Sequence, residues 1–179
     1  MTATGYFKRF IERIKSICFR TREFFEGVHL EHSLWTVILF ILLLQVIVLP
    51  LYIVVIRQIV LAPILLLIAR GVIALISGLL LLFVIVPLYH LSVLIFGGRN
   101  GIKRTFQAFL YGATPTILLS WIPFIGIFAL PYSMYITIIG LITLHEMKTY
   151  KALLAYFIPV LIAVAFIIMA TAITSVFLT

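Results

Sequence analysis

Long apolar runs constrain the fold of this chain more than any other feature. A helix needs about 20 apolar residues to cross the hydrocarbon core of a bilayer. Five runs reach or approach that length, at residues 33–56, 71–96, 105–122, 124–144 and 152–178. We therefore predict an all-α integral membrane protein whose domain, residues 33–179, is a bundle of five transmembrane helices.

The composition supports lipid as the solvent. Hydrophobic residues make up 65% of the 179 residues and charged residues only 10%, which leaves far too much apolar surface for a soluble domain of this size. The net charge of +8 would suggest nucleic acid in a soluble protein. Because the basic residues flank the apolar runs, we expect anionic lipid headgroups as their partners and no nucleic acid.

Residues 1–32 form a separate N-terminal segment. It carries six basic residues and an apolar stripe at spacings of three and four: Tyr6, Phe7, Phe10, Ile11, Ile14, Ile17 and Cys18. This pattern predicts a basic amphipathic helix. The sequence fits two arrangements equally, with the stripe either in the membrane interface or packed on the cytoplasmic ends of the bundle.

The topology depends on residues 59–96, which are too long for one ordinary span. They form either an apolar interfacial segment (59–69) followed by a span (71–96), or two short spans that turn near Ser77. With the N-terminus inside, the first arrangement puts eleven basic residues inside and two outside, whereas the second puts six on each side. The positive-inside rule favours the first. We therefore predict a cytoplasmic N-terminus and a C-terminus outside.

Two cytoplasmic loops would then carry most of the remaining basic residues. They interrupt the apolar sequence at 96–105 and 145–151. We expect their side chains to bind anionic lipid, a protein partner or a second copy of the chain, with these candidate residues: Arg99, Lys103, Arg104, Lys148 and Lys151.

Two histidines and a glutamate are candidates for a polar cluster. His90 lies within about two helical turns of the cytoplasmic end of the second span, at a depth where ionisable groups usually have a partner or a function. His145 and Glu146 lie at the cytoplasmic end of the fourth span. We hypothesise that the three converge, and the alternative is two separately solvated interfacial histidines.

The sequence favours a protein without catalytic, metal or cofactor sites. The segment HEMKTYK begins at His145 like a zinc-protease helix, but Thr149 stands where the second histidine is needed. His29, Glu31 and His32 precede the first span, where polar residues need no metal to explain them. All five carboxylates lie outside the spans, and nucleophile-elbow and Walker motifs are absent, so we expect no enzyme.

Small residues and prolines should shape the bundle. Small side chains permit the close helix packing that drives association in lipid, and candidates occur in four spans: Gly71, Ser77, Gly78, Gly112, Ala113, Gly140 and Ala155. A proline removes a helical hydrogen bond and bends its helix. Four prolines lie inside or near the ends of spans: Pro87, Pro115, Pro131 and Pro159.

Four segments, in this order, resemble the Yip domain, named for Ypt-interacting proteins. They are TREFFEGV (21–28), FGGRNGIKRTFQAFLYGATP (96–115), IPFIG (122–126) and LHEMKTYKALLAYFIP (144–159). The resemblance implies five spans with a cytoplasmic N-terminus. It also assigns family-motif positions to these residues: Phe24, Phe25, Gly97, Gly98, Tyr111, Gly112 and Pro115.

The chain differs from eukaryotic members of that family. It lacks their long N-terminal region and the aspartate, leucine, tyrosine, glycine and proline motif within it. It therefore looks like a short prokaryotic, archaeal-type member, and the GTPase binding of eukaryotic relatives is not carried over.

The leading interpretation is a non-enzymatic membrane scaffold or adaptor in membrane organisation, shaping or trafficking-like processes. It would lie in the cell membrane if prokaryotic and in an endomembrane if eukaryotic. The alternative is a small-solute or lipid transporter or channel, which a polar-lined cavity between the second, third and fourth spans would favour.

Overall fold

Helices make up almost all of the part of the chain that the computed structural model describes, residues 3–28, 33–59, 63–122 and 124–178. No strand occurs among these residues. In chain order the helices are α1 (Ala3–Phe19), α2 (Thr21–Val28), α3 (Leu34–Ile59), α4 (Ile64–Ile95), α5 (Gly101–Gly112), α6 (Thr114–Leu119), α7 (Ile125–Leu144) and α8 (Thr149–Leu178).

Four of these helices are long and apolar enough to cross a membrane, namely α3, α4, α7 and α8. Their mean hydropathy ranges from 1.9 to 3.0 over the apolar part of each. The fold is thus that of an all-α, multi-pass integral membrane protein. The count of five spans and the orientation of the termini stay predictions.

The predicted third span, 105–122, is occupied by two short helices, α5 and α6. Pro115 has no N–H to donate to the Tyr111 carbonyl. The next N–H, that of Thr116, bonds instead to the Ser133 hydroxyl of α7 at 3.0 Å. The helix therefore breaks at Ala113, and α7 supplies the partner for the freed backbone group.

Helix α4 differs from the predicted division of residues 59–96. Residues 64–69, which the sequence assigns to an interfacial segment, form the first turns of α4 and continue through Arg70 without a break. No proline occurs between Pro63 and Pro87 to end a helix there. At 32 residues, or about 48 Å, α4 exceeds the thickness of the hydrocarbon core and must tilt or extend beyond it.

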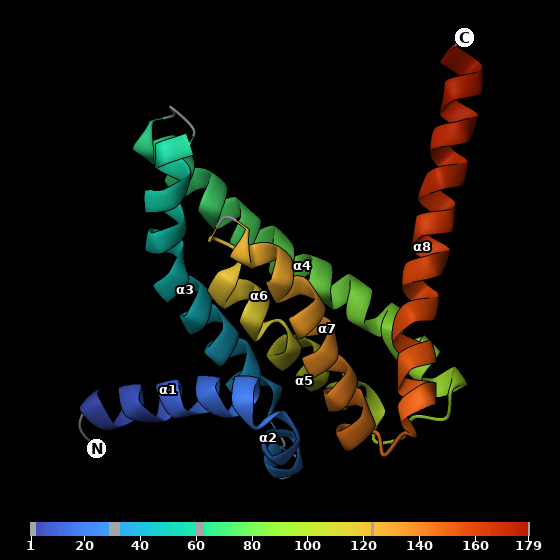
Figure 1. Cartoon of the computed structure of the whole chain (residues 1–179), viewed down its shortest axis with the longest axis horizontal. Helices are drawn as coiled ribbons and strands as arrows, with labels where there is room; N and C mark the ends of the chain where they lie inside the picture. The colour runs from blue at the N-terminus through green and yellow to red at the C-terminus, as the bar shows by residue number, and fades with distance from the viewer. Residues whose placement is uncertain (1–2, 29–32, 60–62, 123, 179) are drawn as a thin grey trace.

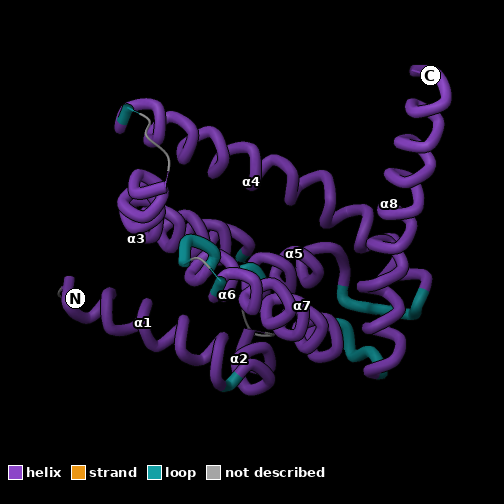
Figure 2. The backbone as a smooth tube through the Cα atoms, turned by 45° about the horizontal axis from the view of Figure 1, so that its top comes forward, coloured by secondary structure: helices purple, strands orange, loops and turns teal. Residues whose placement is uncertain are grey.

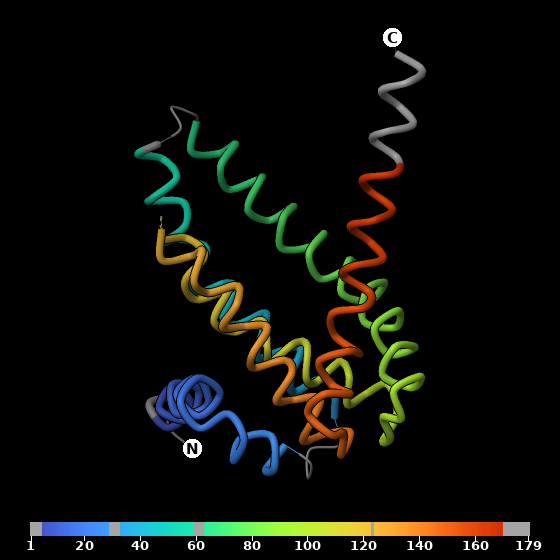
Figure 3. Tube along the Cα trace, turned by 45° about the vertical axis from the view of Figure 1, so that its right-hand side comes forward, coloured from blue at the N-terminus to red at the C-terminus, as the bar shows by residue number. Residues whose placement is uncertain are grey.

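Helices α1 and α2 lie across one end of the bundle, as Figures 1 and 3 show. Ile17 is fully buried, and Phe10 and Ile14 pack against the same core. Tyr6 and Phe7 are about 60% exposed. The apolar stripe of the N-terminal segment is therefore divided, with its later residues packed on the bundle and its earlier aromatic residues exposed.

The core takes in buried residues of α1 to α5, α7 and the start of α8, where Ala152 and Ala155 are fully buried. The later part of α8 stands apart from it. Figure 1 shows α8 meeting α4 near its own start and then diverging. Side chains 161–169 of α8 are all exposed. By contrast, most of α5 is buried, which fits a helix enclosed by protein.

Glycines allow α5 and α7 to approach closely. A Cβ added at Gly112 would lie 3.1 Å from the Thr137 Cα, and closer still to its hydroxyl. A Cβ added at Gly140 would lie 2.8 Å from the Phe25 ring and 3.1 Å from the Ala108 Cα. Neither backbone can give way without moving its helix, so the contact requires glycine.

We predict that Gly112→Ala destabilises the protein by about 1–3 kcal/mol, because the methyl group forces α5 away from α7. Gly78→Ala is the matched control, since nothing lies within 4 Å of an added Cβ at that helical position. Alanine favours a helix over glycine by about 1 kcal/mol, so the control should be neutral or stabilising. Thermal unfolding in detergent tests both, and equal effects would contradict the close packing.

Candidate functional site

Two loops lie side by side at one end of the bundle, which we call the loop end: residues 96–100 between α4 and α5, and 145–148 between α7 and α8 (Figure 2). The Asn100 side-chain amide donates to the Leu144 carbonyl at 2.9 Å. Gly97 and Asn100 both have positive φ, 84° and 71°, conformations that glycine and asparagine adopt most easily. The turn residues of the first loop thus place it against the second.

A chain of hydrogen bonds joins three helices at the loop end. His90 Nδ1 of α4 lies 2.8 Å from the Thr105 hydroxyl of α5. The same hydroxyl lies 2.9 Å from Nε2 of His145, directly after α7. His145 Nδ1 bonds to the Arg99 carbonyl. The structure therefore brings His90 and His145 together, with Thr105 between them.

The positions of the protons in this series of hydrogen bonds follow from what each group can donate or accept. The Arg99 carbonyl only accepts, so His145 Nδ1 carries the proton and Nε2 of the neutral ring accepts. Thr105 must then donate its single proton to His145. Its oxygen in turn accepts from Nδ1–H of His90. With His145 neutral, every bond of this chain is therefore satisfied.

The electrostatics of His145 agree with a neutral ring. Burial lowers the pKa of His145 to about 4, and the charges of His90 and Arg104 act in the same direction, whereas the bond to the Arg99 carbonyl opposes them. Only 1% of the side chain is exposed. A buried imidazole without a carboxylate partner is held in its uncharged form. Glu146, the third predicted member, is exposed and has a positive φ of 53°.

The structure divides the predicted basic residues into two groups. Arg99, Lys103 and Lys148 are exposed at or beside the loop end. Arg104 is half-buried and donates to the Val28 carbonyl at 3.0 Å and to the Gln107 side chain at 2.9 Å. Lys151 is half-buried beside Gly97. Arg104 thus holds α2 to α5, and the first three form the exposed basic surface.

A second cluster, which we call the aromatic joint, holds α1 and α2 on the bundle. Tyr111 of α5 is fully buried. Its ring centroid lies 4.8 Å from that of Phe24, 6.3 Å from that of Phe25 and 5.7 Å from that of Phe40. The Arg13 guanidinium of α1 lies 5.3 Å from the centroid of Tyr111 and 5.7 Å from that of Phe40, within reach of a cation–π interaction.

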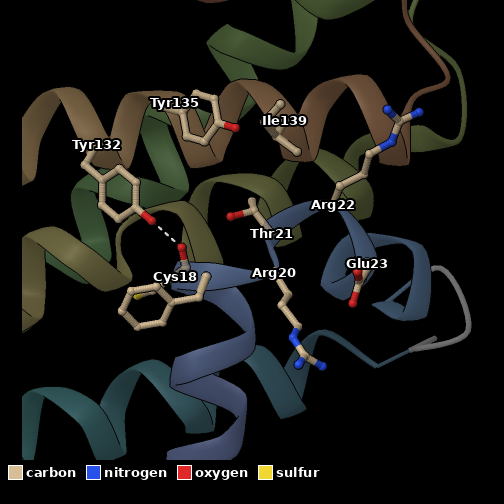
Figure 4. A pocket seen from close by; sticks show the side chains of 9 residues that line it. Cys18, Arg20, Thr21, Arg22, Glu23, Tyr132, Tyr135 and Ile139 are labelled. Atoms are coloured by element: carbon tan, nitrogen blue, oxygen red, sulfur yellow. Dashed lines mark hydrogen bonds between the residues drawn. The ribbon is translucent and has the colours of Figure 1, made fainter.

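A third contact attaches the turn between α1 and α2 to α7. Figure 4 shows the Tyr132 hydroxyl directed at the Cys18 carbonyl, to which it donates a hydrogen bond. Burial raises the pKa of the Cys18 thiol, so this single cysteine is a poor nucleophile. The neighbouring concavity of about 520 Å³ is lined by Arg20, Arg22 and Tyr135, among others.

The remaining motif glycines and proline act on the backbone. A Cβ added at Gly98 would lie 2.9 Å from the Val93 carbonyl oxygen and 3.2 Å from the Met147 sulfur. Pro115 is buried in the first turn of α6. With Gly112 against Thr137, these positions set how closely α4, α5 and α7 meet.

A family model of the Yip1 domain matches residues 14–172, nearly the whole chain. The chain belongs to the Yip1 domain family. The resemblance seen in the four sequence segments is therefore confirmed. No curated protein gives a significant match, and neither does any solved structure.

In this Yip1 domain, sequence reasoning missed Thr105, Arg13 and Phe40. Thr105 has no charge or motif to mark it, and only its position one helical turn past the basic loop could have suggested that it faces the histidines. Arg13 counts among the basic residues of an amphipathic helix, where charged groups usually face solvent. Its place beside Tyr111 depends on how α1 packs.

Among the described residues of the Yip1 domain, no group of three histidine, cysteine or acidic side chains is placed to hold a metal ion. His29, Glu31 and His32 lie outside the described residues. His145, which begins the zinc-protease-like segment, is engaged with Thr105 and Arg99.

We predict that His145 stabilises the fold above pH 6.5 and that this contribution is lost as the pH falls toward 4. The unfolded chain, with its ordinary pKa of 6.5, takes up the proton first, and the folded state resists it. The full loss is about 3 kcal/mol. Thermal unfolding of the wild-type and His145→Gln proteins at pH 7 and pH 4.5 measures this loss. The decrease in stability between the two pH values should be larger in the wild type, and equal decreases would contradict a buried, neutral His145.

Proposed function

We propose that this Yip1 domain is a non-enzymatic scaffold or adaptor of the membrane. In this function the bundle anchors the chain, and the loop end with α1 and α2 presents a fixed, basic surface to lipid headgroups or to a partner protein. The aromatic joint is the observation that carries the proposal, because it holds the amphipathic helices in one position relative to the spans.

The charge distribution supports this proposal. Exposed basic residues occur on α1, at the start of α2 and at the loop end, and this set is Lys8, Arg9, Lys15, Arg20, Arg22, Arg99, Lys103 and Lys148. Each basic side chain near an anionic membrane surface contributes about 1 kcal/mol of attraction. Their number is sufficient for reversible, salt-sensitive contact with a second membrane or an acidic protein.

A non-catalytic function agrees with membership of the Yip1 family. The buried His145 and Thr105 of the loop end also bond to each other and to neighbouring protein groups rather than to an open space. His145 is enclosed, and Thr105 is fully buried between the histidines. Such an arrangement serves structure better than substrate chemistry, which needs an accessible acid or base.

Transport of a small solute or lipid is the second candidate function. One observation favours it, a partly polar cavity between α3, α4 and α6. That cavity is bounded by the first, second and predicted third spans. From the sequence, transport would have been favoured by a cavity between the second, third and fourth spans. Reproducible solute or lipid flux through reconstituted vesicles would support transport and contradict the scaffold.

The scaffold proposal predicts charge-dependent recruitment of membranes. Purified protein in neutral vesicles should capture fluorescent, protein-free vesicles that contain anionic lipid. Replacing Arg99, Lys103 and Lys148 by glutamate should reduce capture at least tenfold, because three attractions of about 1 kcal/mol are lost and repulsions replace them. Capture should also fall with added salt.

A control is available at the end of the bundle opposite the loop end. Arg57, at the end of α3, and Arg70, in α4, are exposed there. Replacing both by glutamate changes the net charge without touching the loop end and should leave capture nearly unchanged. Equal loss in both variants, or capture that ignores lipid charge, would contradict the proposal.

A further inference from the structure

The concavity beside the turn between α1 and α2 combines basic and aromatic walls. Its volume is about 520 Å³, and it is lined by the end of α1, the first turn of α2 and one face of α7. Figure 4 shows Arg20 and Arg22 extending on opposite sides of Thr21, while Tyr132 and Tyr135 project from α7 beside them. A molecule in this concavity would therefore touch basic groups of the turn and aromatic rings of a span.

The basic wall offers donors for an anion. Among the described residues, neither the Arg20 guanidinium nor the Tyr135 hydroxyl has a hydrogen-bond or ion-pair partner. Arg22 pairs with Glu26 through Nε at 3.4 Å, but both side chains are well exposed, at 81% and 59%. Such a surface pair contributes little, so Arg22 can exchange it for a phosphate. Guanidinium groups bind phosphate oxygens two at a time.

The charge of the lining residues also favours an anion. Of the described residues that line the concavity, Arg20 and Arg22 are basic and Glu23 alone is acidic. Burial raises the pKa of the Cys18 thiol, which therefore adds no negative charge. The wall as a whole is positive, and it would attract a phosphate.

The aromatic wall continues into a track for an acyl chain. Tyr132 and Tyr135 stack, with ring centroids 6.2 Å apart and planes 9° apart. Phe128 and Ile125 precede Tyr132 at spacings of four and three residues, so all four lie on one face of α7. Phe128 is 73% exposed and Ile125 48% exposed. Because α7 is long and apolar enough to cross the membrane, this face is open to lipid chains.

The order of these groups matches a phospholipid. Tyrosines are enriched where headgroups meet hydrocarbon, and the Tyr132 hydroxyl holds the turn to α7 at this point by donating to the Cys18 carbonyl. A phospholipid likewise has a charged phosphate, then a polar glycerol, then apolar chains. A soluble phosphate would bind the arginines but make no use of the apolar face.

We propose that this concavity binds an anionic phospholipid of the membrane that the bundle crosses. The guanidinium groups of Arg20 and Arg22 hold its phosphate. The Tyr135 hydroxyl donates to a phosphate or ester oxygen, and one acyl chain packs along Phe128 and Ile125. The bound lipid joins the turn between α1 and α2 to α7. This site is separate from the basic loop end, and it does not rest on the scaffold proposal.

Native mass spectrometry of the protein in detergent counts bound lipids and gives their dissociation constants. Dioctanoyl phosphatidylglycerol is the probe. Two fragments separate the sources of its binding, since dioctanoylglycerol lacks the phosphate and glycerol 3-phosphate lacks the chains. We expect saturable binding of the whole lipid and at least about tenfold weaker binding of each fragment. Equal binding of dioctanoylglycerol would contradict the phosphate contact, and equal binding of glycerol 3-phosphate would show a soluble anion site instead.

A pair of double variants tests the basic wall. Replacing Arg20 and Arg22 by glutamine should weaken the first bound phosphatidylglycerol at least about tenfold, because two charge-assisted contacts are lost. The matched control replaces Lys8 and Arg9 by glutamine. Both are exposed on α1 outside the concavity, so this variant has the same net charge and should bind nearly as the wild type does. Equal dissociation constants in the two variants would overturn the proposal.

Tyr135→Phe tests the site without changing any charge. It removes one hydroxyl at an exposed position and should weaken phosphatidylglycerol about fivefold, within the range of one hydrogen bond. Tyr150→Phe, at an exposed tyrosine of α8, should have no effect. An unchanged constant in Tyr135→Phe would also overturn the proposal. Vesicle capture should be the same in Tyr135→Phe and wild type, which separates this proposal from the preceding one.

Discussion

The packing around Tyr111 holds the surface helices to the spans. Its ring is enclosed by aromatic residues of α2 and α3, and the Arg13 guanidinium of α1 lies against it. Aromatic pairs contribute about 0.5–1.5 kcal/mol each beyond burial, and a desolvated cation–π contact adds a similar amount. Because lipid provides little hydrophobic drive between helices, such specific contacts decide where α1 and α2 lie.

Helix α5 connects this joint to the loop end. Thr105, near its start, bonds to both histidines, and Tyr111 lies six residues later, about 9 Å along the helix axis. The break before Pro115 and the contacts of Gly112 and Gly140 then fix α5 against α7. A displacement of α5 would therefore disturb the loop end and the surface helices together.

The parts of this structure that depend on hydropathy could be predicted from the sequence. The parts in which a single local contact determines where a helix begins or ends could not. Apolar runs placed α3, α7 and α8 to within about a turn, and motif order predicted the family. A bend at Pro115 was predicted, but the break of this span into α5 and α6 was not, because it depends on the Ser133 hydroxyl of α7, which accepts from the Thr116 N–H. The continuous start of α4 was missed because Arg70 was taken as a boundary.

At the candidate site, the depth of His90 and His145 suggested a cluster, but not its composition. Thr105 completes it in place of Glu146, which is exposed. The Tyr111 and Phe24–Phe25 motifs were recognised as family positions. That they touch one another, with Arg13 against them, depends on tertiary packing that no periodicity encodes.

A distance measurement across the aromatic joint tests the central claim most directly. In a Cys18→Ser background, spin labels would be placed at Lys8 on α1 and Phe128 on α7, both exposed. A rigid joint predicts one narrow distance distribution in the parent protein and a broad one after Tyr111→Ala. A broad distribution in the parent, or no change in the variant, would contradict the claim that this joint fixes α1 and α2 on the bundle.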